Sequence, residues 1–352
     1  MAEGYLDATA VRRLAQELGL RPSKRRGQNF VVDANTIRRL VRLAGLDRYG
    51  AEPSESVREP SAAGDHDHRV PGAEREFSAT PSHDGRWDGS ESSTGAVVLE
   101  VGPGLGSLTA GLLAAGAEVT AVEVEPALAR RLPQTMAELQ PPAAHRLRVV
   151  EADALRLVRL PEPEPTKLVA NLPYNLAVPI LLHCWQTWPS LDSALVMVQA
   201  EVADRLTAAP GSKAYGVPSA KIAWRATATR AGSVPASVFW PQPQVESALV
   251  RLTRRDPPAT SATRQQVFAV VEAAFGQRRK MIRSALAARF PAAVVEAALA
   301  AAGIAPATRG ERLDIAQFAR LAAALAAVRG AQGAGPAQPE DGAEPTRPGP
   351  RP

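Results

Sequence analysis

The sequence has few features that would stabilise a chain without a hydrophobic core. A single cysteine, Cys184, among 352 residues excludes an internal disulfide and a cysteine-ligated metal site. No stretch approaches about 20 uninterrupted apolar residues, so we expect no membrane-spanning helix. Residues 1–4 lack the charged start and apolar core of a secretory signal. These absences predict a cytoplasmic protein that folds by burying apolar side chains.

The charges are distributed unevenly along the chain. The formal net charge is +5, but residues 47–95 contain eleven acidic residues against five arginines and no lysine. Residues 331–352 add three acidic residues and two arginines. The rest of the chain carries 34 basic and 22 acidic residues, which favours a polyanionic partner such as a nucleic acid.

Residues 47–95 also lack apolar periodicity. Gly, Pro, Ser and acidic residues dominate this segment, and such a composition buries too little apolar surface to offset the entropy of the chain. The segment therefore predicts a disordered acidic insertion. It contains three of the five histidines, two of them in the Asp-His-Asp-His run at 65–68, which is more typical of a solvated polar segment than of a metal site.

Apolar periodicity elsewhere predicts strands that alternate with helices. Strands are predicted at residues 97–101, 118–123, 147–152, 167–170 and 195–198, and a late antiparallel strand at 247–252. After each of the first two strands, apolar residues recur with the spacing of a helix. This alternation is typical of a doubly wound, mostly parallel α/β sheet.

The chain is predicted to contain five segments. They are a helical N-terminal part with a basic loop at 1–46, the insertion at 47–95, an α/β domain at 96–256, a small all-helical domain at 262–329 and a disordered tail at 330–352. The first segment is predicted to belong to the α/β domain.

A glycine-rich run, Glu100-Val-Gly-Pro-Gly-Leu-Gly106, lies directly after the first predicted strand. Without side chains, Gly102 and Gly104 let the main chain turn sharply and approach a ligand closely. The G-x-G-x-G spacing differs from the G-x-G-x-x-G of dinucleotide binders. The run predicts a nucleotide-like cofactor at the turn from strand to helix.

Two acidic residues follow the next two predicted strands. Glu123 ends its strand 21 residues after Gly102, where a carboxylate can accept hydrogen bonds from both hydroxyls of a ribose. Asp153 ends the third predicted strand and is placed to bind an adenine amine. Together with the glycine spacing, these residues favour S-adenosylmethionine over a nicotinamide cofactor.

The tetrapeptide Asn171-Leu172-Pro173-Tyr174 follows the fourth predicted strand. An aromatic amine is a poor nucleophile because its lone pair is delocalised into the ring. The Asn171 side-chain oxygen and the Leu172 carbonyl can each accept one N–H and aim the lone pair at an electrophile. Pro173 restricts Leu172 to an extended conformation, and Tyr174 would stack on the base. The motif predicts methylation of the amino group of a base.

An extruded base needs an aromatic contact on its other face as well. Phe239 is the predicted candidate, and the neighbouring Trp240 is the alternative. No metal ligand is predicted for this reaction.

Six motifs together resemble the small-subunit ribosomal RNA adenine dimethyltransferases. They are Gly27-Gln-Asn-Phe30, Glu100-Val-Gly-Pro-Gly-Leu-Gly106, Asn171-Leu-Pro-Tyr-Asn175, Ser212-Lys-Ala-Tyr-Gly216, Phe239-x-Pro-x-Pro-x-Val-x-Ser247 and Phe275-Gly-Gln-Arg-Arg-Lys280. The resemblance implies a Rossmann-like class I methyltransferase sheet with a small C-terminal all-helical domain. It also implies transfer of four methyl groups to two adjacent adenines in the 3′-terminal hairpin loop of 16S rRNA, within an immature 30S subunit.

The resemblance assigns cofactor contacts by motif. These fall on Asn29, Val31, Gly102, Glu123, Asp153 and Asn171. Valine stands at position 31 where leucine is commoner, and a main-chain contact would survive that change. The acidic insertion is not a feature of the family.

Two basic clusters fit an RNA partner. Lys24, Arg25 and Arg26 precede the first motif, and the sequence predicts that Arg278, Arg279, Lys280 and Arg283 crowd one helix of the second domain. Contacts from such clusters to phosphates would weaken steeply with salt. A monomeric protein is expected.

Two alternative functions remain open. A 23S rRNA adenine dimethyltransferase that confers macrolide resistance shares the cofactor motif and the amine motif. A ribosome-assembly factor whose methylation is incidental would share the basic clusters.

Overall fold

The structure, a computed structural model, describes residues 4–20, 29–46 and 95–333 of the 352-residue chain. Several predictions from the sequence therefore lie outside the described residues. They concern the acidic insertion, most of the C-terminal tail and the basic loop with Lys24, Arg25 and Arg26.

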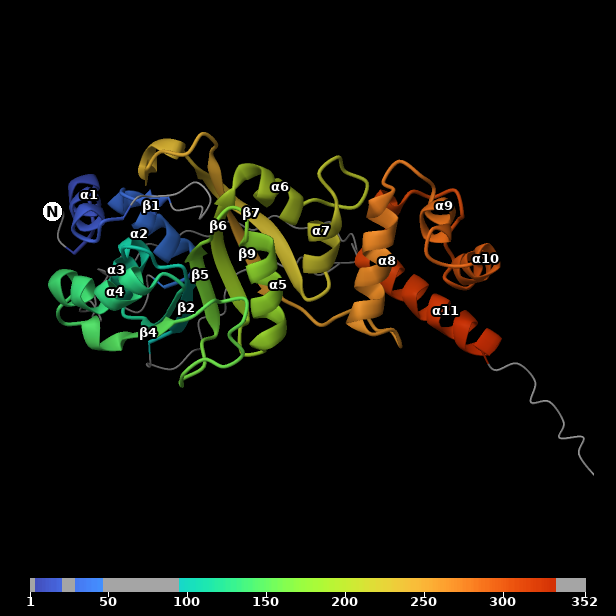
Figure 1. The fold of residues 1–352 in the computed structure, drawn as a ribbon, viewed down its shortest axis with the longest axis horizontal. Helices are drawn as coiled ribbons and strands as arrows, with labels where there is room; N and C mark the ends of the chain where they lie inside the picture. Colours follow the sequence, from blue (N-terminus) through green and yellow to red (C-terminus); the bar gives the residue numbers. More distant parts are fainter. Residues whose placement is uncertain (1–3, 21–28, 47–94, 334–352) are drawn as a thin grey trace, which may run out of the picture. The chain divides into compact units, whose positions relative to one another are not determined.

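The chain divides into two compact units (Figure 1). The first comprises Met1–Ile180, Thr187–Val198 and Ser233–Ser247, and the second Leu181–Gln186, Gln199–Gly232 and Ala248–Pro352. The second unit contains the whole helical segment predicted at 262–329, together with a part of the chain that precedes it. The domain boundaries predicted from the sequence stay a prediction.

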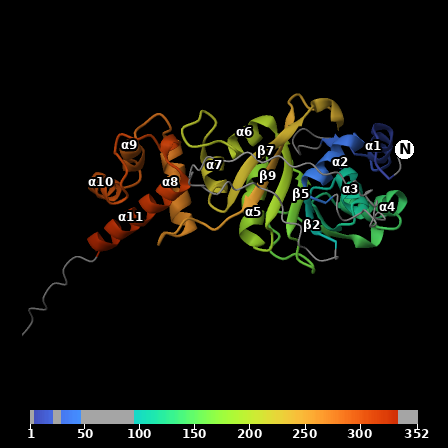
Figure 2. The same cartoon turned by 180° about the vertical axis from the view of Figure 1, so that it is seen from behind.

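The first unit contains five parallel strands in the order β4-β3-β2-β5-β6. They are β2 (Val97–Val101), β3 (Glu118–Glu123), β4 (Leu147–Glu151), β5 (Lys167–Asn171) and β6 (Ser193–Gln199). Figure 2 shows β2 and β5 next to each other, as their register requires. The predicted parallel α/β sheet is confirmed: β2 and β3 have the predicted ends, and the ends of β4, β5 and β6 lie within two residues of the predicted ones.

Helices of the first unit pack on this sheet and on one another. They are α1 (Ala8–Glu17), α2 (Ala34–Leu43), α3 (Ser107–Ala114) and α4 (Pro126–Leu139), and α5 (Ala177–Thr187) follows β5. Asp7 and Asp33 cap α1 and α2, because each carboxylate accepts a hydrogen bond from a main-chain N–H of the first turn at 2.8 Å. Helix α4 packs on β3 and β4, and α3 packs on α2 and β3.

Two very short strands form a separate ribbon that the sequence analysis did not predict. β1 (Phe30–Val31) pairs antiparallel with β8 (Phe239–Trp240), so that Phe30 lies opposite Trp240 and Val31 opposite Phe239. The two strands are more than 200 positions apart, and two residues are too few to show a period. Three-residue 3₁₀ helices lie at Ala144–Arg146, Ala236–Val238 and Gly310–Arg312.

The second unit is mainly helical and has its own core. Its elements are α6 (Ala200–Leu206), α7 (Val217–Ile222), most of β7 (Ala226–Val234) and β9 (Ser247–Arg254), α8 (Arg264–Gly276), α9 (Ile282–Ala287), α10 (Ala292–Ala301) and α11 (Ile315–Gly333). β7 and β9 are neighbouring strands. Val267 and Val271 of α8, Leu299 of α10 and Phe318 of α11 are fully buried in this core.

The motif at 212–216 is attached to the C-terminal helices of this unit. The Tyr215 hydroxyl is buried and donates a hydrogen bond to the Leu313 carbonyl at 2.9 Å. The Gly211 N–H donates to the Glu311 carbonyl at 2.7 Å. Tyr215 also belongs to the apolar cluster of α8, α10 and α11. The motif therefore has a structural role within the second unit.

Replacing Tyr215→Phe should destabilise the second unit by about 1 kcal/mol, because the buried Leu313 carbonyl loses its donor. Urea unfolding followed by circular dichroism measures the change. Tyr5→Phe is the matched control, since the Tyr5 ring is only half-buried and contacts the Arg38 guanidinium. Equal unfolding midpoints for Tyr215→Phe and the wild type would contradict the assignment.

Candidate active site

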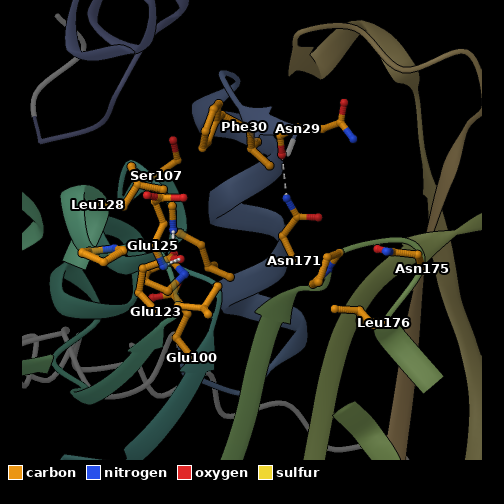
Figure 3. Close-up of a pocket in the computed structure, with 18 residues that line it drawn as sticks. Asn29, Phe30, Glu100, Ser107, Glu123, Glu125, Leu128, Asn171, Asn175 and Leu176 are labelled. Atoms are coloured by element: carbon orange, nitrogen blue, oxygen red, sulfur yellow. Dashed lines mark hydrogen bonds between the residues drawn. The ribbon is translucent and has the colours of Figure 1, made fainter. Parts of the chain in front are cut away.

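The carboxyl ends of β2, β3 and β5 meet at one edge of the parallel sheet and enclose a cavity of about 590 Å³ (Figure 3). Ligands of open α/β sheets bind at this edge, and the volume suits a cofactor. Its lining includes six residues from the predicted cofactor and reaction sites: Asn29, Val31, Gly102, Gly104, Glu123 and Asn171. Pro173 lines the cavity as well.

The glycine run forms the turn between β2 and α3. Gly102 and Gly104 have φ angles of 72° and 59°, in the left-handed region that disfavours side chains. A Cβ atom on Gly104 would lie 2.8 Å from Cε1 of Phe30, a distance that real Cβ contacts do not show. Glycine at 104 therefore lets the loop pass directly beneath the Phe30 ring.

Glu123, at the end of β3, connects this loop to the next strand. Its Oε2 accepts the Gly104 N–H at 3.1 Å, and its Oε1 accepts the Glu125 N–H at 2.9 Å. Burial raises the pKa of Glu123, and the hydrogen bond from Gly104 opposes that shift. Each carboxylate oxygen keeps a second lone pair, so the group can still accept hydrogen bonds from a ligand.

Glu100 is a site residue that the sequence reasoning did not assign. It lies on β2, lines the cavity and is 1% exposed. Burial raises its pKa to about 8, and the Thr109 hydroxyl, which donates to Oε2 at 2.7 Å, opposes the shift. The sequence signal for Glu100 as a site residue was its position two residues before the first glycine of the loop. Its burial follows only from the tertiary packing.

Asn171 faces Glu123 across the cavity (Figure 3). Its Nδ2 donates a hydrogen bond to the Asn29 carbonyl at 2.9 Å. Because a carbonyl oxygen accepts and does not donate, this contact fixes which end of the carboxamide points toward Asn29. The Asn171 side-chain oxygen consequently points away from Asn29, as Figure 3 shows.

The next residue, Leu172, is held by its main chain. Its N–H donates to the Met197 carbonyl of β6 at 3.0 Å, and its side chain is buried. The Leu176 N–H donates to the Pro173 carbonyl at 3.0 Å and closes the turn that leads into α5. The two acceptors proposed from the sequence therefore lie on neighbouring residues whose main chain is fixed.

The predicted aromatic residues do not line the cavity: Tyr174 belongs to this turn, and Phe239 and Trp240 lie on β8. Tyr174 is half-buried, and Phe239 is 3% exposed on β8. Trp240 stacks on Phe30 with a centroid distance of 6.4 Å and an interplanar angle of 23°. The choice of Phe239 over Trp240 as the base-facing aromatic stays a prediction.

Asp153 is the predicted contact that the structure does not bring to the cavity lining. β4 ends at Glu151, and Asp153 follows in a turn where Oδ1 accepts the Leu155 N–H at 2.9 Å. Arg156 lies 3.8 Å from the same carboxylate. The predicted contact of Asp153 with an adenine amine stays a prediction.

Ser107 is a second lining residue that the sequence did not suggest. It is the first residue of α3 and is 7% exposed, and within the described part of the chain its Oγ has no hydrogen-bond partner. A buried hydroxyl without a partner is rare in a folded protein. The cavity therefore offers an unused polar group next to the glycine loop.

The basic residues predicted on one helix of the second unit lie on two elements, which corrects the prediction. α8 ends at Gly276, so that Arg278, Arg279 and Lys280 form the following turn, and Arg283 lies on α9. Gln277, with φ of −126° and ψ of 53°, ends the helical conformation there. Arg278 is used internally, because it pairs with Glu311 at 2.9 Å and donates to the Lys213 carbonyl at 2.7 Å.

Within the described residues, no group of three or more His, Cys, Asp or Glu side chains is arranged to hold a metal ion. The same part of the chain contains no helix that is both long and apolar enough to cross a bilayer. Cys184 is fully buried, and burial raises the pKa of its thiol to about 12, as expected for a core residue.

A parallel sheet with a glycine loop after its first strand and a cavity at the strand ends is the arrangement of nucleotide-cofactor folds, to which the class I S-adenosylmethionine-dependent methyltransferases belong. The family model described as "Ribosomal RNA adenine dimethylase" matches residues 84–327. The chain therefore belongs to the ribosomal RNA adenine dimethylase family, and the enzyme class predicted from the six motifs is confirmed.

Relatives of this chain carry the name "Ribosomal RNA small subunit methyltransferase A". The one from Thermobifida fusca is 51% identical over 89% of this chain and 93% of its own length. The one from Cutibacterium acnes is 50% identical over 92% of this chain and 95% of its own length.

Two solved structures share the fold. The 23S rRNA methyltransferase ErmE has a TM-score of 0.54 and 26% identity over 85% of this chain and all of its own. A dimethyladenosine transferase from Plasmodium falciparum has a TM-score of 0.55 and 22% identity over 65% of this chain and 89% of its own. The second likeness shows the fold alone.

Glu100→Gln should stabilise the protein increasingly as the pH rises from 5 to 8. The raised pKa of Glu100 means that the folded state holds a proton that the unfolded state has released, so stability falls as pH rises between 4.5 and about 8. Glutamine keeps an acceptor for Thr109 and removes this dependence.

The expected difference from the wild type grows by on the order of 1 kcal/mol for each pH unit in that window. Urea unfolding at several pH values measures it. Glu118→Gln is the control, since Glu118 begins the neighbouring strand and its side chain is 38% exposed beside Arg148. Parallel pH profiles for Glu100→Gln and the wild type would refute the assignment.

Proposed function

We propose that this enzyme uses S-adenosylmethionine to dimethylate the N6 amines of two adjacent adenines in the 3′-terminal hairpin loop of 16S rRNA, within an immature 30S subunit. The observation that carries the proposal is the Asn171 carboxamide, whose NH2 bonds to Asn29 and whose oxygen remains available at the cavity. The names of relatives at about 50% identity support the small subunit as the target.

The cavity residues fit the cofactor. Apolar side chains of Val124, Pro126 and Leu128 line one part of it, while Glu123 and the Ser107 hydroxyl, which has no hydrogen-bond partner among the described residues, supply polar groups. The residues proposed to hold the cofactor are Asn29, Val31, Gly102, Gly104, Glu123, Asp153 and Asn171. When bound, S-adenosylmethionine supplies an electrophilic methyl group. No metal is proposed for the reaction.

The protein activates the amine by positioning it. The Asn171 Oδ1 and the Leu172 carbonyl each accept one N–H of the adenine amine, which turns the nitrogen lone pair toward the electrophile. Both acceptors are held, one by Asn29 and the other by the hydrogen bond from its own N–H to Met197. Such preorganisation of two reactants lowers barriers by on the order of 7–11 kcal/mol in favourable cases.

Aromatic side chains hold the base. In single-stranded loops, RNA bases are splayed out and stack on aromatic rings. We propose that Tyr174 stacks on one face of the adenine and Phe239 on the other. Tyr174 follows the amine-binding residues directly, and Phe239 lies on the strand that pairs with β1 beside Asn29.

The alternative of a 23S rRNA enzyme is supported by the fold of ErmE. That likeness has 26% identity, whereas relatives named for the small subunit reach 51% over nearly the same length. The proposal therefore favours the small subunit.

A role in ribosome assembly would coexist with catalysis, because the enzyme must bind the immature subunit before it transfers a methyl group, whether or not binding also assists assembly. A monomeric cytoplasmic protein is proposed.

Arg279 and Lys280, in the turn after α8, and Arg283, on α9, are proposed to contact RNA phosphates. All three are exposed, and within the described residues no acidic side chain pairs with them. Arg278 differs because its guanidinium already bonds to Glu311 and Lys213. We infer that Arg278 supports this turn, while its three neighbours supply the charge. Lys24, Arg25 and Arg26 are proposed to act beside the cofactor.

Asn171→Asp should lower kcat/KM by about 100-fold or more, the loss typical when one preorganised group is removed. The new carboxylate oxygen would face the Asn29 carbonyl and lose the hydrogen bond that orients the side chain. Methylation of unmethylated 30S particles, mapped by primer extension on 16S rRNA, is the measurement.

Asn35→Asp is the matched control for that variant, since Asn35 is exposed at the start of α2 and its side-chain oxygen accepts a hydrogen bond from the exposed Arg38. The proposal is wrong if wild-type enzyme modifies naked 23S RNA but leaves the small-subunit particles unmodified. If Asn171→Asp abolishes methylation yet restores 30S maturation in a deletion strain, the assembly role dominates.

Arg279→Gln should weaken binding to 30S particles and reduce the slope of log K against log salt by roughly one, as expected for one lost phosphate contact. Arg320→Gln, which removes one exposed charge from α11, should leave both quantities unchanged. Filter binding at several salt concentrations provides the data.

Arg278→Gln should instead lower the free energy of unfolding, because it removes a partly exposed ion pair to Glu311 and a hydrogen bond to the Lys213 carbonyl. An unchanged salt slope for Arg279→Gln would exclude this turn from the RNA surface.

A further inference from the structure

A buried serine that has no assigned role contacts the reaction centre. Ser247 is the first residue of β9 and is 0% exposed. Its Oγ lies 3.0 Å from the hydroxyl of Tyr174, 73 positions away in the chain. Both residues belong to the first unit. The tetrapeptide 171–174 is therefore attached at a third point, in addition to the bonds of Asn171 and Leu172.

This contact fixes the far end of the Tyr174 side chain. A tyrosine ring turns about two bonds only, and its near end is already held by the Leu172 main chain and by the turn at Pro173. Because the Ser247 hydroxyl is inaccessible to solvent, water does not compete for the bond. Burial raises the pKa of Tyr174, so its phenol keeps its proton and either hydroxyl can donate.

We propose that Ser247 is a positioning residue that holds the Tyr174 ring in the orientation on which the target adenine stacks. The inference rests on the proposed base-stacking role of Tyr174. Because the ring is oriented before the base arrives, binding of the base does not have to order the Tyr174 side chain and loses less conformational entropy. Ser247 itself touches neither the base nor the cofactor.

The test compares Tyr174→Phe, Ser247→Ala and the double variant in full-length enzyme acting on unmethylated 30S particles. Each single variant should raise KM for the particles about threefold to tenfold, the effect of one hydrogen bond. The value of kcat and the affinity for S-adenosylmethionine should stay unchanged. Because both changes break the same bond, the double variant should be no worse than either single one.

Ser247→Thr keeps the hydroxyl and should restore a wild-type KM. Additive effects in the double variant, or a wild-type KM for Tyr174→Phe, would overturn the inference. Should Ser247→Ala fail to fold, Tyr174→Phe still decides, because it removes the same hydrogen bond from the half-buried partner.

Tyr174→Ala separates this inference from the function on which it rests. A raised KM for Tyr174→Ala together with a wild-type KM for Ser247→Ala would reject the role of Ser247 alone. A wild-type KM for Tyr174→Ala would reject stacking by Tyr174, and the role of Ser247 with it. Absence of methylation by the wild-type enzyme would reject the proposed function itself.

Discussion

The Asn171 side-chain NH2 donates a hydrogen bond to the Asn29 carbonyl at 2.9 Å, and this contact joins the end of β5 to the residue before β1. It orients a carboxamide that would otherwise rotate freely between two nearly equivalent ends. Since β1 pairs with β8, the same contact also relates Asn171 to the strand that carries Phe239. The residues proposed to bind the cofactor and the strand of Phe239 are thus joined by this side-chain hydrogen bond and the β1–β8 pairing.

The wall of the cavity that faces Asn171 is formed in part by the buried carboxyl groups of Glu100 and Glu123. Glu123 binds the glycine loop through Gly104, and Glu100 lies beneath it with its pKa raised to about 8. Two acids so deeply buried reduce stability, and residues that reduce stability persist mainly at functional sites. The wall near Asn171 is by contrast held by neutral hydrogen bonds. The two walls therefore offer a ligand different polar groups, carboxyl groups on one side and neutral acceptors on the other.

Basic residues near one another in sequence have different roles in the second unit. Arg278 is bonded to Glu311 and to the Lys213 carbonyl, which connects the turn after α8 to the segment around the 212–216 motif. Arg279 and Lys280 follow it directly and remain exposed. Both side chains are exposed because α8 ends at Gly276 and they lie in the turn that follows. In a helix that continued, these successive side chains would lie on different faces.

The sequence by itself determined the parallel α/β sheet, the glycine turn and, through its motifs, the enzyme class, because each depends on local periodicity or on residues adjacent in the chain. Tertiary structure alone decided the β1–β8 ribbon, the orientation of the Asn171 carboxamide and the burial of Glu100, Ser107 and Ser247. Each of these needs a partner that lies far away in the chain or the packing of several elements. A local pattern carries no information on such distant partners, which are set only when the strands assemble.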